Sequence, residues 1–275
     1  MSQKCYLCVK VKDFVLIIPC YNNREGLLRS LHSIGYERNK FEVLIVDDGS
    51  AEPLLAQELC EGDLSGMQLQ VYRNETNKGV AVSLNRALSV LLKRDDVKYI
   101  ARLDAGDLCA EERFTMQVSY MDEHPEVALV GSRVLFEHFE TGKSYLYKNK
   151  TSYPDIQKEM HFKCSFIHPS VMFRKELLHD IGLYPENYPH CEDYAFFFKI
   201  IQKHEAVIFP EILLVSEISR EGVSAQNRTR QIFSRMQVVN KFGSNTLFKI
   251  GGLFKLLLLL LVPVRAVHKM NTINK

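Results

Sequence analysis

A repeated alternation of apolar runs and amphipathic segments in the first half of the chain constrains the fold more than any other feature. Short apolar runs with the length and composition of buried strands occupy residues 13–19, 41–50, 67–74 and 97–107. Segments with apolar residues at helical spacing follow them, and Leu84, Leu88 and Leu91 share one face of the clearest segment. Strands that alternate with helices predict an α/β fold with a mostly parallel central sheet and helices on both faces.

The polar residues of this half gather where the apolar runs end. The stretch "PCYNN" follows the first run, "DDGS" closes the second, and "DAGD" closes the fourth. Ligands of parallel sheets bind beside the carboxyl ends of the strands, whereas ordinary acidic turns would fall at either edge. The coincidence therefore predicts one ligand site at this edge of the sheet.

Composition, net charge and cysteine content limit the possible classes of protein and partner. The chain has 275 residues, of which 46% are hydrophobic and 25% charged, as in a globular protein able to bury a core. A formal net charge of +2 provides no global field for nucleic acid, so we expect no such partner. Cys5 and Cys8 form a Cys-x-x-Cys without the second pair that a zinc site would need. With no secretory signal peptide, the composition favours reduced thiols and a cytoplasmic location.

Six motifs then occur in the order found in a known family. They are "IIPCYNN", "VLIVDDGS", "NKGVAVSLNRAL", "IARLDAGD", "IHPSVMFR" and "CEDYAFF". In these motifs the chain resembles the family 2 glycosyltransferases of bacterial cell-surface polysaccharide synthesis, over residues 13–225. The resemblance implies the Rossmann-like GT-A fold and transfer of a sugar from a nucleotide donor with inversion at the anomeric carbon.

The resemblance also implies the domain organisation. Residues 1–242 would form the GT-A domain, with a nucleotide-binding half near 13–125 and an acceptor-binding, catalytic half near 126–225. Further strands are expected in the second half, including a hairpin that turns at 141–142. Residues 243–275 remain as a basic, amphipathic tail.

Residues at the first strand ends are candidates for nucleotide binding. Tyr21, after Pro19, could stack on a base, and Asn22 could cap the following helix. The resemblance places this segment in the nucleotide pocket. Asp48 ends an apolar strand and needs a donor, either a uracil N–H, as the resemblance implies, or the amides of its own turn. Lys78 and free amides at a helix start suit a diphosphate, although a plain helix cap explains the same residues.

Asp104 and Asp107 are the candidate metal ligands. A hard divalent cation, Mn²⁺ or Mg²⁺, held by carboxylate oxygens would neutralise a leaving diphosphate. The family usually carries Asp-x-Asp here, so the residue that ordinarily ligates the metal is Gly106 in this chain. The resemblance keeps Asp104 near the ribose and the metal, and Asp107 could reach the ion directly or through water. Gly106 predicts weaker metal binding than in the family, and the alternative is an acidic turn before a helix.

The second half supplies candidates for catalysis and acceptor binding. Asp193 matches the general base of the family, and its helix N-terminus favours the ionised carboxylate that this role needs. Glu192 beside it and His168 are candidates for contacts with the acceptor or the diphosphate, although both also fit structural roles. The Arg-x-His of many relatives is missing at residues 217–219, where Arg220 could partly substitute.

The tail contains five Lys or Arg and no Asp or Glu between residues 243 and 275. A helix that spans a bilayer needs about 20 apolar residues. The apolar run of the tail is shorter than this, and Lys255 and Pro263 interrupt it. The composition favours a helix in the membrane interface, with leucines among the headgroups and cations on anionic lipid. The alternative is a helix packed on the domain. An anchor suits a lipid-linked acceptor and a peripheral location on the inner face of the cytoplasmic membrane.

The sequence therefore predicts an inverting glycosyltransferase with a nucleotide-sugar donor, a UDP-sugar being favoured. The sugar would pass to a hydroxyl of a lipid-linked glycan acceptor in the synthesis of O-antigen, capsule or lipopolysaccharide. Gly106 and the altered residues 217–219 leave one alternative open, an inactive sugar-nucleotide-binding module of a membrane complex. An unrelated Rossmann-type enzyme is disfavoured, because no Gly-x-Gly-x-x-Gly follows the first strand. The pattern makes no prediction of oligomeric state.

Overall fold

The structure is a computed structural model that describes residues 11–138, 141–218 and 227–261. Cys5, Cys8 and Arg220 lie outside the described residues. The elements of the first half are β1 (Lys12–Cys20), α1 (Arg24–His32), β2 (Phe41–Asp47), α2 (Ala56–Leu59), β3 (Leu69–Arg73), α3 (Val80–Leu91), β4 (Val97–Arg102), β5 (Leu108–Cys109) and α4 (Arg113–Glu123). Those of the second half are β6 (Val127–His138), β7 (Lys143–Tyr147), α5 (Tyr153–Glu159), β8 (Met172–Arg174), α6 (Leu177–Ile181), α7 (Glu192–Ile201), β9 (Glu205–Glu217), α9 (Arg228–Phe242) and α10 (Thr246–Leu261).

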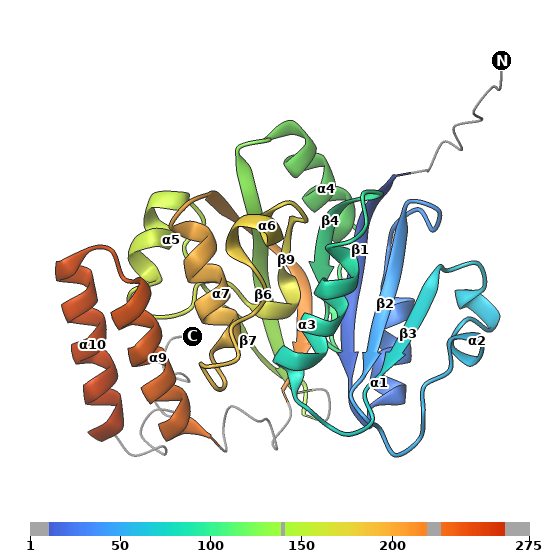
Figure 1. The fold of residues 1–275 in the computed structure, drawn as a ribbon, viewed down its shortest axis with the longest axis horizontal. Coiled ribbons are helices and arrows are strands. Elements are labelled where there is room, and N and C mark those ends of the chain that lie inside the picture. The colour runs from blue at the N-terminus through green and yellow to red at the C-terminus, as the bar shows by residue number, and fades with distance from the viewer. Residues whose placement is uncertain (1–10, 139–140, 219–226, 262–275) are drawn as a thin grey trace.

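The described strands form a single sheet in the order β3-β2-β1-β4-β8-β6-β9-β5, with β7 paired to β6 (Figure 1). The strands β3, β2, β1 and β4 are parallel, as the alternation of strands and helices predicts. Beyond β4 the sheet is mixed, because β8 runs antiparallel to both β4 and β6 and β5 runs antiparallel to β9. The predicted α/β fold is confirmed, and every antiparallel pairing among the described strands includes a strand of the second half.

The core lies on both faces of the sheet, and β1 shows how the sequence divides it. Phe14, Leu16 and Ile18 face the side covered by α1, α2 and α4. Val15 and Ile17 face the side covered by α3 and α7. All of these side chains are at most 1% exposed, and burial of each contributes about 1.5–3 kcal/mol. A strand that is apolar on both faces requires two helical layers, which is why the run at residues 13–19 reads as continuous apolar sequence.

The hairpin predicted around residues 141–142 is confirmed. Strands β6 and β7 pair antiparallel from Val134–Tyr147 to His138–Lys143. Gly142 closes the turn with φ of 63°, a conformation that favours glycine, and its amide donates to the His138 carbonyl oxygen at 2.8 Å.

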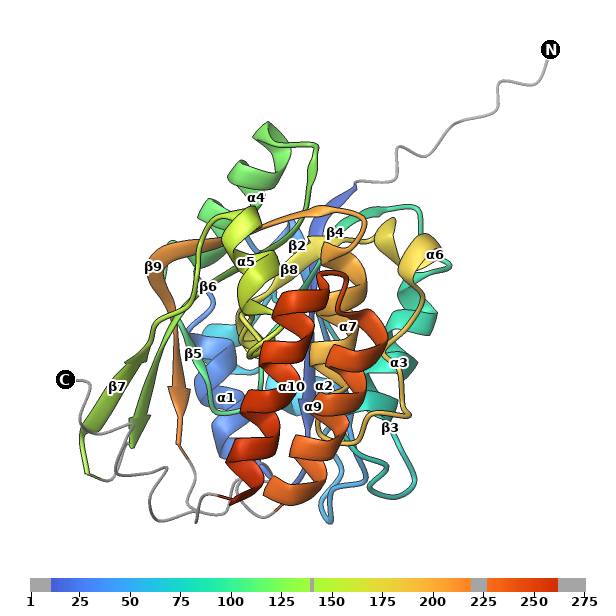
Figure 2. The same ribbon diagram turned by 90° about the vertical axis from the view of Figure 1, so that its left-hand side faces the viewer.

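The helices α9 and α10 lie side by side at one end of the molecule (Figure 2). Two glycines let α10 pack closely on the domain. A Cβ atom at Gly252 would lie 1.9 Å from the His161 carbonyl oxygen, and one at Gly251 would lie 3.2 Å from the Phe162 ring. The described part of the predicted tail is therefore a helix docked on the domain along one side. No helix among the described residues is long and apolar enough to cross a membrane.

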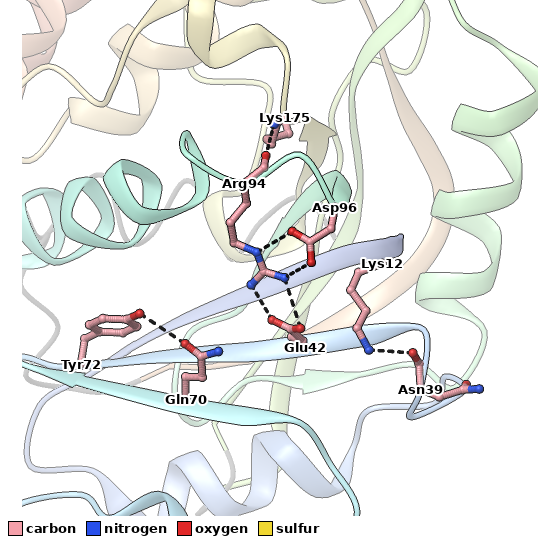
Figure 3. A network of polar contacts seen from close by, with 8 residues as sticks. All are labelled: Lys12, Asn39, Glu42, Gln70, Tyr72, Arg94, Asp96 and Lys175. Atoms are coloured by element: carbon pink, nitrogen blue, oxygen red, sulfur yellow. Dashed lines mark hydrogen bonds and ion pairs between the residues drawn. The ribbon is translucent and has the colours of Figure 1, made fainter. Parts of the chain in front are cut away.

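At the amino ends of the parallel strands, charged residues are paired with one another. Figure 3 shows Arg94, which follows α3, between two carboxylates. Its guanidinium donates to Glu42 of β2 at 2.6 Å and to Asp96 at 2.7 Å. Lys12 and Lys175 end on backbone carbonyl oxygens in the same network. The charged residues that Figure 3 shows at this rim therefore have partners within the protein.

Candidate active site

A cleft of about 1010 Å³ opens at the carboxyl ends of β1, β2 and β4 and extends to α7 and α9. Of the residues singled out in the sequence, eight line it: Pro19, Tyr21, Asp48, Lys78, Asp104, His168, Glu192 and Asp193. Asn22 and Asp107 lie close to the cleft but outside its lining. The structure thus brings the candidates for donor binding and those for catalysis into one site.

Asp48 is 4% exposed and is held by groups from the loop between β3 and α3. Its Oδ1 accepts from the Asn74 side chain at 2.8 Å and from the Lys78 amide at 3.0 Å, and its Oδ2 accepts from the Gly79 amide at 2.8 Å. A carboxylate has about four acceptor positions, so room for a single further donor, such as a base N–H, remains. Asp48 therefore orders the loop before α3 whatever ligand it contacts.

The turn after β2 donates to Asp47 and not to Asp48. Asp47 accepts from the Ser50 amide at 2.9 Å and forms an ion pair with Arg73 at 2.8 Å. Gly49 makes the turn possible, because its φ is 78° and a Cβ atom there would lie 2.5 Å from the Thr76 carbonyl carbon. The alternative in which its own turn amides satisfy Asp48 is therefore wrong, because the Asn74 side chain and the Lys78 and Gly79 amides perform this role.

Asp48 also changes the anion site expected at the start of α3. The Lys78 and Gly79 amides are not free, because both donate to Asp48. The next three amides, of residues 80–82, precede the first possible intrahelical bond of the helix, and these residues line the cleft. An anion at this helix N-terminus would therefore meet the amides of residues 80–82 and the exposed Lys78 side chain.

The expectation that Asn22 caps the first helix is wrong by one residue. Asn23 is the cap, and its side chain accepts from the Gly26 amide at 3.1 Å. Asn22 has φ of 50° and instead links two loops, because its Oδ1 accepts from the Ala51 amide at 2.8 Å. Both residues therefore hold the loop that presents Tyr21, whose side chain is 48% exposed in the cleft.

The two candidate metal ligands lie in different surroundings. The Asp104 carboxylate is 45% exposed in the cleft, and the buried Arg102 guanidinium contacts its Oδ1 at 2.7 Å. Asp107 is only 6% exposed, and its Oδ1 accepts from the Glu217 amide at 3.3 Å. Burial and then the charge of Asp104 raise the pKa of Asp107 to about 7. Direct ligation by Asp107 would require its carboxyl group to turn out of this position.

No three His, Cys, Asp or Glu side chains in the described part of the chain are grouped closely enough to hold an ion. Gly106, with φ of 115°, leaves space that a Cβ atom could occupy 3.5 Å from Asn23 and from Glu217. Of the two candidate ligands, Asp104 has the accessible carboxylate. This donor set fits a cation held jointly by Asp104 and by the phosphate oxygens of a ligand, because Mg²⁺ commonly uses one or two carboxylates together with substrate phosphates.

His168 belongs to the same network as Arg102 and Asp104. Burial and then the charge of Arg102 hold the pKa of His168 well below its usual range. Arg102 Nε donates to His168 Nε2 at 3.3 Å, and the Tyr184 hydroxyl lies 3.0 Å from the same nitrogen. Arginine has no acceptor, so Nε2 is the unprotonated nitrogen. His168 thus links Asp104, through Arg102, to the loop that leads into α7.

Asp193 lies in the first turn of α7 and is half-buried. Its Oδ1 accepts from the Tyr194 amide at 2.7 Å. Burial and then the charge of Glu192 raise its pKa from 3.8 to about 7, although that amide and Arg235 oppose the shift. The expected effect of the helix N-terminus is present, but desolvation outweighs it. A carboxylate with this pKa can accept a proton near neutral pH.

Sequence reasoning missed the contribution of α9. Arg230, Gln231 and Arg235 of this helix line the cleft beside Asp193. Gln231 ties α9 to the loop before α7, because its side chain donates to the His190 carbonyl oxygen at 3.3 Å. None of these residues belongs to a recognisable motif, and the basic residues of the polar segment 228–235 were the only signal available.

The fold is the GT-A fold, as comparison with solved structures shows. The fold is similar to that of S. aureus TarS 1-349 in complex with UDP, with a TM-score of 0.66 and 19% identity over 89% of this chain and 70% of that one. It is also similar to the mannosyltransferase PcManGT from Pyrobaculum calidifontis in complex with GDP-Man and Mn²⁺. That comparison has a TM-score of 0.62 and 19% identity over 84% of this chain and 64% of the other.

The chain belongs to glycosyl transferase family 2, whose sequence model matches residues 15–182. The amylovoran biosynthesis glycosyltransferase AmsE of Erwinia amylovora is 32% identical over 232 residues, which cover 82% of this chain and 84% of that protein. An uncharacterized glycosyltransferase of Haemophilus influenzae is 26% identical over 72% of each chain. The protein is a glycosyltransferase, as its motifs predict.

Proposed function

We propose that the protein transfers a sugar, with inversion, from a UDP-sugar to a hydroxyl group of a lipid-linked glycan during polysaccharide synthesis. The observation that carries this proposal is the presence of Asp48, Asp104 and Asp193 in one cleft. The similarity to a protein of amylovoran biosynthesis supports the polysaccharide product. The similarity to a fold solved with UDP supports the donor.

The donor would lie across the carboxyl ends of β1, β2 and β4. Tyr21 offers an exposed ring on which the base can stack, and Asp48 has one acceptor position left for a base N–H. The diphosphate would lie near Lys78 and the amides that begin α3. Asp104 would contact the ribose and hold Mn²⁺ or Mg²⁺ together with the diphosphate. When bound, the cation would neutralise charge on the leaving group.

Asp193 would act as the general base. Its carboxylate takes the proton of the acceptor hydroxyl as the acceptor oxygen forms a bond to the anomeric carbon. The bond from that carbon to the diphosphate oxygen breaks, and UDP leaves from the opposite face. Arg102 is buried and donates to Asp104 Oδ1 and to His168 Nε2, and it would thereby keep the Asp104 carboxylate in place.

The acceptor would be presented at a membrane surface. An apolar stripe on α10 is exposed, and it consists of Leu247, Ile250, Phe254, Leu257, Leu258 and Leu261. Residues 243–275 carry cations and no carboxylates, which suits anionic lipid. We therefore propose a GT-A domain at 1–242 and a membrane-binding segment at 243–275, on the inner face of the cytoplasmic membrane. The part of this segment after residue 261 lies outside the described residues.

Calorimetry with UDP, GDP and dTDP, each with and without Mn²⁺, tests the donor, and UDP with Mn²⁺ should bind most tightly. Labelled UDP-sugars and a lipid extract from the source cells then test transfer. The anomeric coupling constant of the product distinguishes inversion from retention. Tight UDP binding without transfer of any sugar would favour the inactive-module alternative.

A further inference from the structure

A buried amide in the middle of α3 holds a loop that is distant in sequence. Asn85 is 9% exposed on a buried face of α3 that is otherwise mostly apolar, and a buried amide is costly unless it is hydrogen-bonded. Its Nδ2 donates to the Tyr184 carbonyl oxygen at 2.9 Å and to Glu186 Oε1 at 3.0 Å, and its Oδ1 accepts from the Tyr184 amide at 2.9 Å. Two acceptors and one donor around the side chain fix its orientation. All three bonds lead to the loop at residues 182–191, between α6 and α7.

The loop at 182–191 forms one wall of the cleft and leads to the candidate base. Five of its residues line the cleft: Glu186, Tyr188, Pro189, His190 and Cys191. The loop contains no helix or strand, and it ends directly before α7, whose first turn carries Asp193. Because no ladder of backbone hydrogen bonds holds such a loop, its contacts with neighbouring elements fix its place. The bonds to Asn85 therefore help to determine where Asp193 lies.

The same helix carries the donor side of the cleft at its N-terminus. Residues 80–82 line the cleft there, where the donor diphosphate is proposed to bind. Ala81 and Asn85 are four residues apart, so they lie on the same face of α3 in successive turns. At about 1.5 Å per residue, their separation along the helix axis is about 6 Å. The loop at 182–191 is thus attached to α3 about one turn from the proposed diphosphate site.

Tyr184 extends this connection to α7 and to Asp104. It is 2% exposed, and its ring stacks on Phe196 of α7 with 4.2 Å between the ring centroids. Its hydroxyl lies 3.0 Å from His168 Nε2, the nitrogen to which Arg102 also donates. Arg102 in turn donates to Asp104 Oδ1 at 2.7 Å. One buried residue therefore joins α3, through its backbone, to α7 and to the hydrogen-bond network of Asp104.

We propose that Asn85 is a positioning residue, which sets the place of Asp193 relative to the donor diphosphate at the start of α3. It does so through the backbone of Tyr184 and the carboxylate of Glu186. The inference rests on the proposed function for the places of donor and base. Transfer requires the base, the acceptor oxygen and the anomeric carbon to be aligned, and a misplacement of about 1 Å can lower a rate by about 100-fold. Loss of these hydrogen bonds should therefore lower kcat much more than it weakens UDP binding.

The variant N85D of the full-length protein tests the proposal. Asp has nearly the size of Asn and can still accept from the Tyr184 amide, but it cannot donate, and its charge faces the Glu186 carboxylate. In transfer assays with labelled UDP-sugars and a lipid extract from the source cells, N85D should lower kcat by about 10- to 100-fold. Calorimetry should give a Kd for UDP with Mn²⁺ within about twofold of the native value, because the groups proposed to hold UDP are unchanged.

A second substitution restores the contact with donor and acceptor exchanged. E186Q alone keeps an acceptor for Asn85 without the charge and should lower kcat by about two- to fivefold, because a hydrogen bond to a charged group is roughly twice as strong as a neutral one. In N85D/E186Q the introduced amide can donate to the introduced carboxylate, and the double variant should have a kcat about tenfold above that of N85D. Glu75→Gln is the matched control with native kcat, since Glu75 is exposed in the loop between β3 and α3 and lies outside the cleft lining.

Amide hydrogen exchange provides a readout that needs no turnover. UDP with Mn²⁺ should slow exchange in the native protein both at residues 78–82 and in the loop at 182–191, because the two segments are joined. In N85D it should slow exchange at residues 78–82 alone. If N85D does not fold, E186A takes its place in these measurements; it keeps the bonds between Asn85 and Tyr184 and should lower kcat by about fivefold.

Three outcomes would overturn the inference. The first is a native kcat in N85D, or a loss of UDP affinity as large as the loss of kcat. The second is a double variant no more active than N85D, and the third is unchanged protection of the loop at 182–191 when N85D binds UDP. If the native protein binds UDP without transferring sugar, the exchange measurement alone decides. Failure of the native protein to bind UDP would instead refute the proposed function, so the two failures are distinguishable.

Discussion

Replacement of Asp193 by Asn should abolish sugar transfer and, at the same time, make the folded protein more stable above neutral pH. Burial and the charge of Glu192 raise the pKa of Asp193 from 3.8 to about 7. Between these two values the folded state binds a proton that the unfolded state has lost. The free energy of unfolding therefore falls as the pH rises through this window, and above pH 7 the full penalty is present. An Asn side chain carries no charge and avoids the penalty.

The expected gain follows from the size of the shift. A change in pKa from 3.8 to about 7 corresponds to about 4 kcal/mol, at about 1.4 kcal/mol for each unit. Asp193 is only half-buried, and water screens its charge, so we expect a gain of about 1–2 kcal/mol at pH 8. Asn can keep the hydrogen bond from the Tyr194 amide, because its Oδ1 accepts as the carboxylate oxygen does.

Denaturant unfolding of both proteins at pH 5 and pH 8 measures this gain, which should shrink at the lower pH. Asp180→Asn is the control of opposite sign. Hydrogen bonds from Lys203 and His204 lower the pKa of Asp180, so its loss should destabilise the protein at pH 8 and leave transfer intact. If the Asp193→Asn variant still transferred sugar, the role of Asp193 as general base would be refuted. An inactive variant that is less stable than the native protein at pH 8 would refute the electrostatic reasoning.

Four further predictions concern the same molecule. The kcat/KM of the native enzyme should fall about tenfold per unit below pH 7, because Asp193 must be ionised; a flat profile down to pH 5 would contradict this. Asp104→Asn should remove the Mn²⁺ binding that calorimetry detects in the presence of UDP. Without UDP, Mn²⁺ should release little heat on addition to either the native protein or the variant. Tyr21→Ala should weaken UDP by about 10-fold, from about 1–3 kcal/mol of base stacking, whereas Tyr21→Phe should retain it. Arg94→Met should lower the free energy of unfolding by about 2 kcal/mol, because it leaves the partly buried carboxylates of Glu42 and Asp96 without this partner. It should leave kcat unchanged.

The parallel half of the fold was predictable because β1, β2 and β4 are buried on both faces and its helices are amphipathic. The mixed half was less accessible, since β8 has three residues and β5 has two. Elements this short carry no periodicity, and their pairing with β4 and β9 depends on contacts distant in sequence. Side-chain alternation along the chain contains no information on such pairing.

In the site, residues at strand ends were predictable and residues fixed by loop geometry were not. Asp48, Asp104 and Asp193 each follow or begin a regular element, so their place could be inferred. Asn22 and Asn23 are both competent caps, and only the positive φ of Asn22 decides between them. The packing of α9 on α7 brings Arg235 close to Asp193, and no sequence motif predicts this contact.

The two rims of the sheet show how the protein tolerates an unfavourable active site. At the amino ends of the strands, Arg94 meets two carboxylates with good geometry, and its hydrogen bond lowers the pKa of Asp96. At the carboxyl ends, burial raises the pKa of Asp107 and of Asp193. Charges at that rim oppose folding near neutral pH. The donor diphosphate is itself anionic, so the counter-charge would come from a divalent cation bound with it. Binding of the donor together with Mn²⁺ should therefore stabilise this fold more strongly as the pH rises above 7, where both carboxyl groups are ionised.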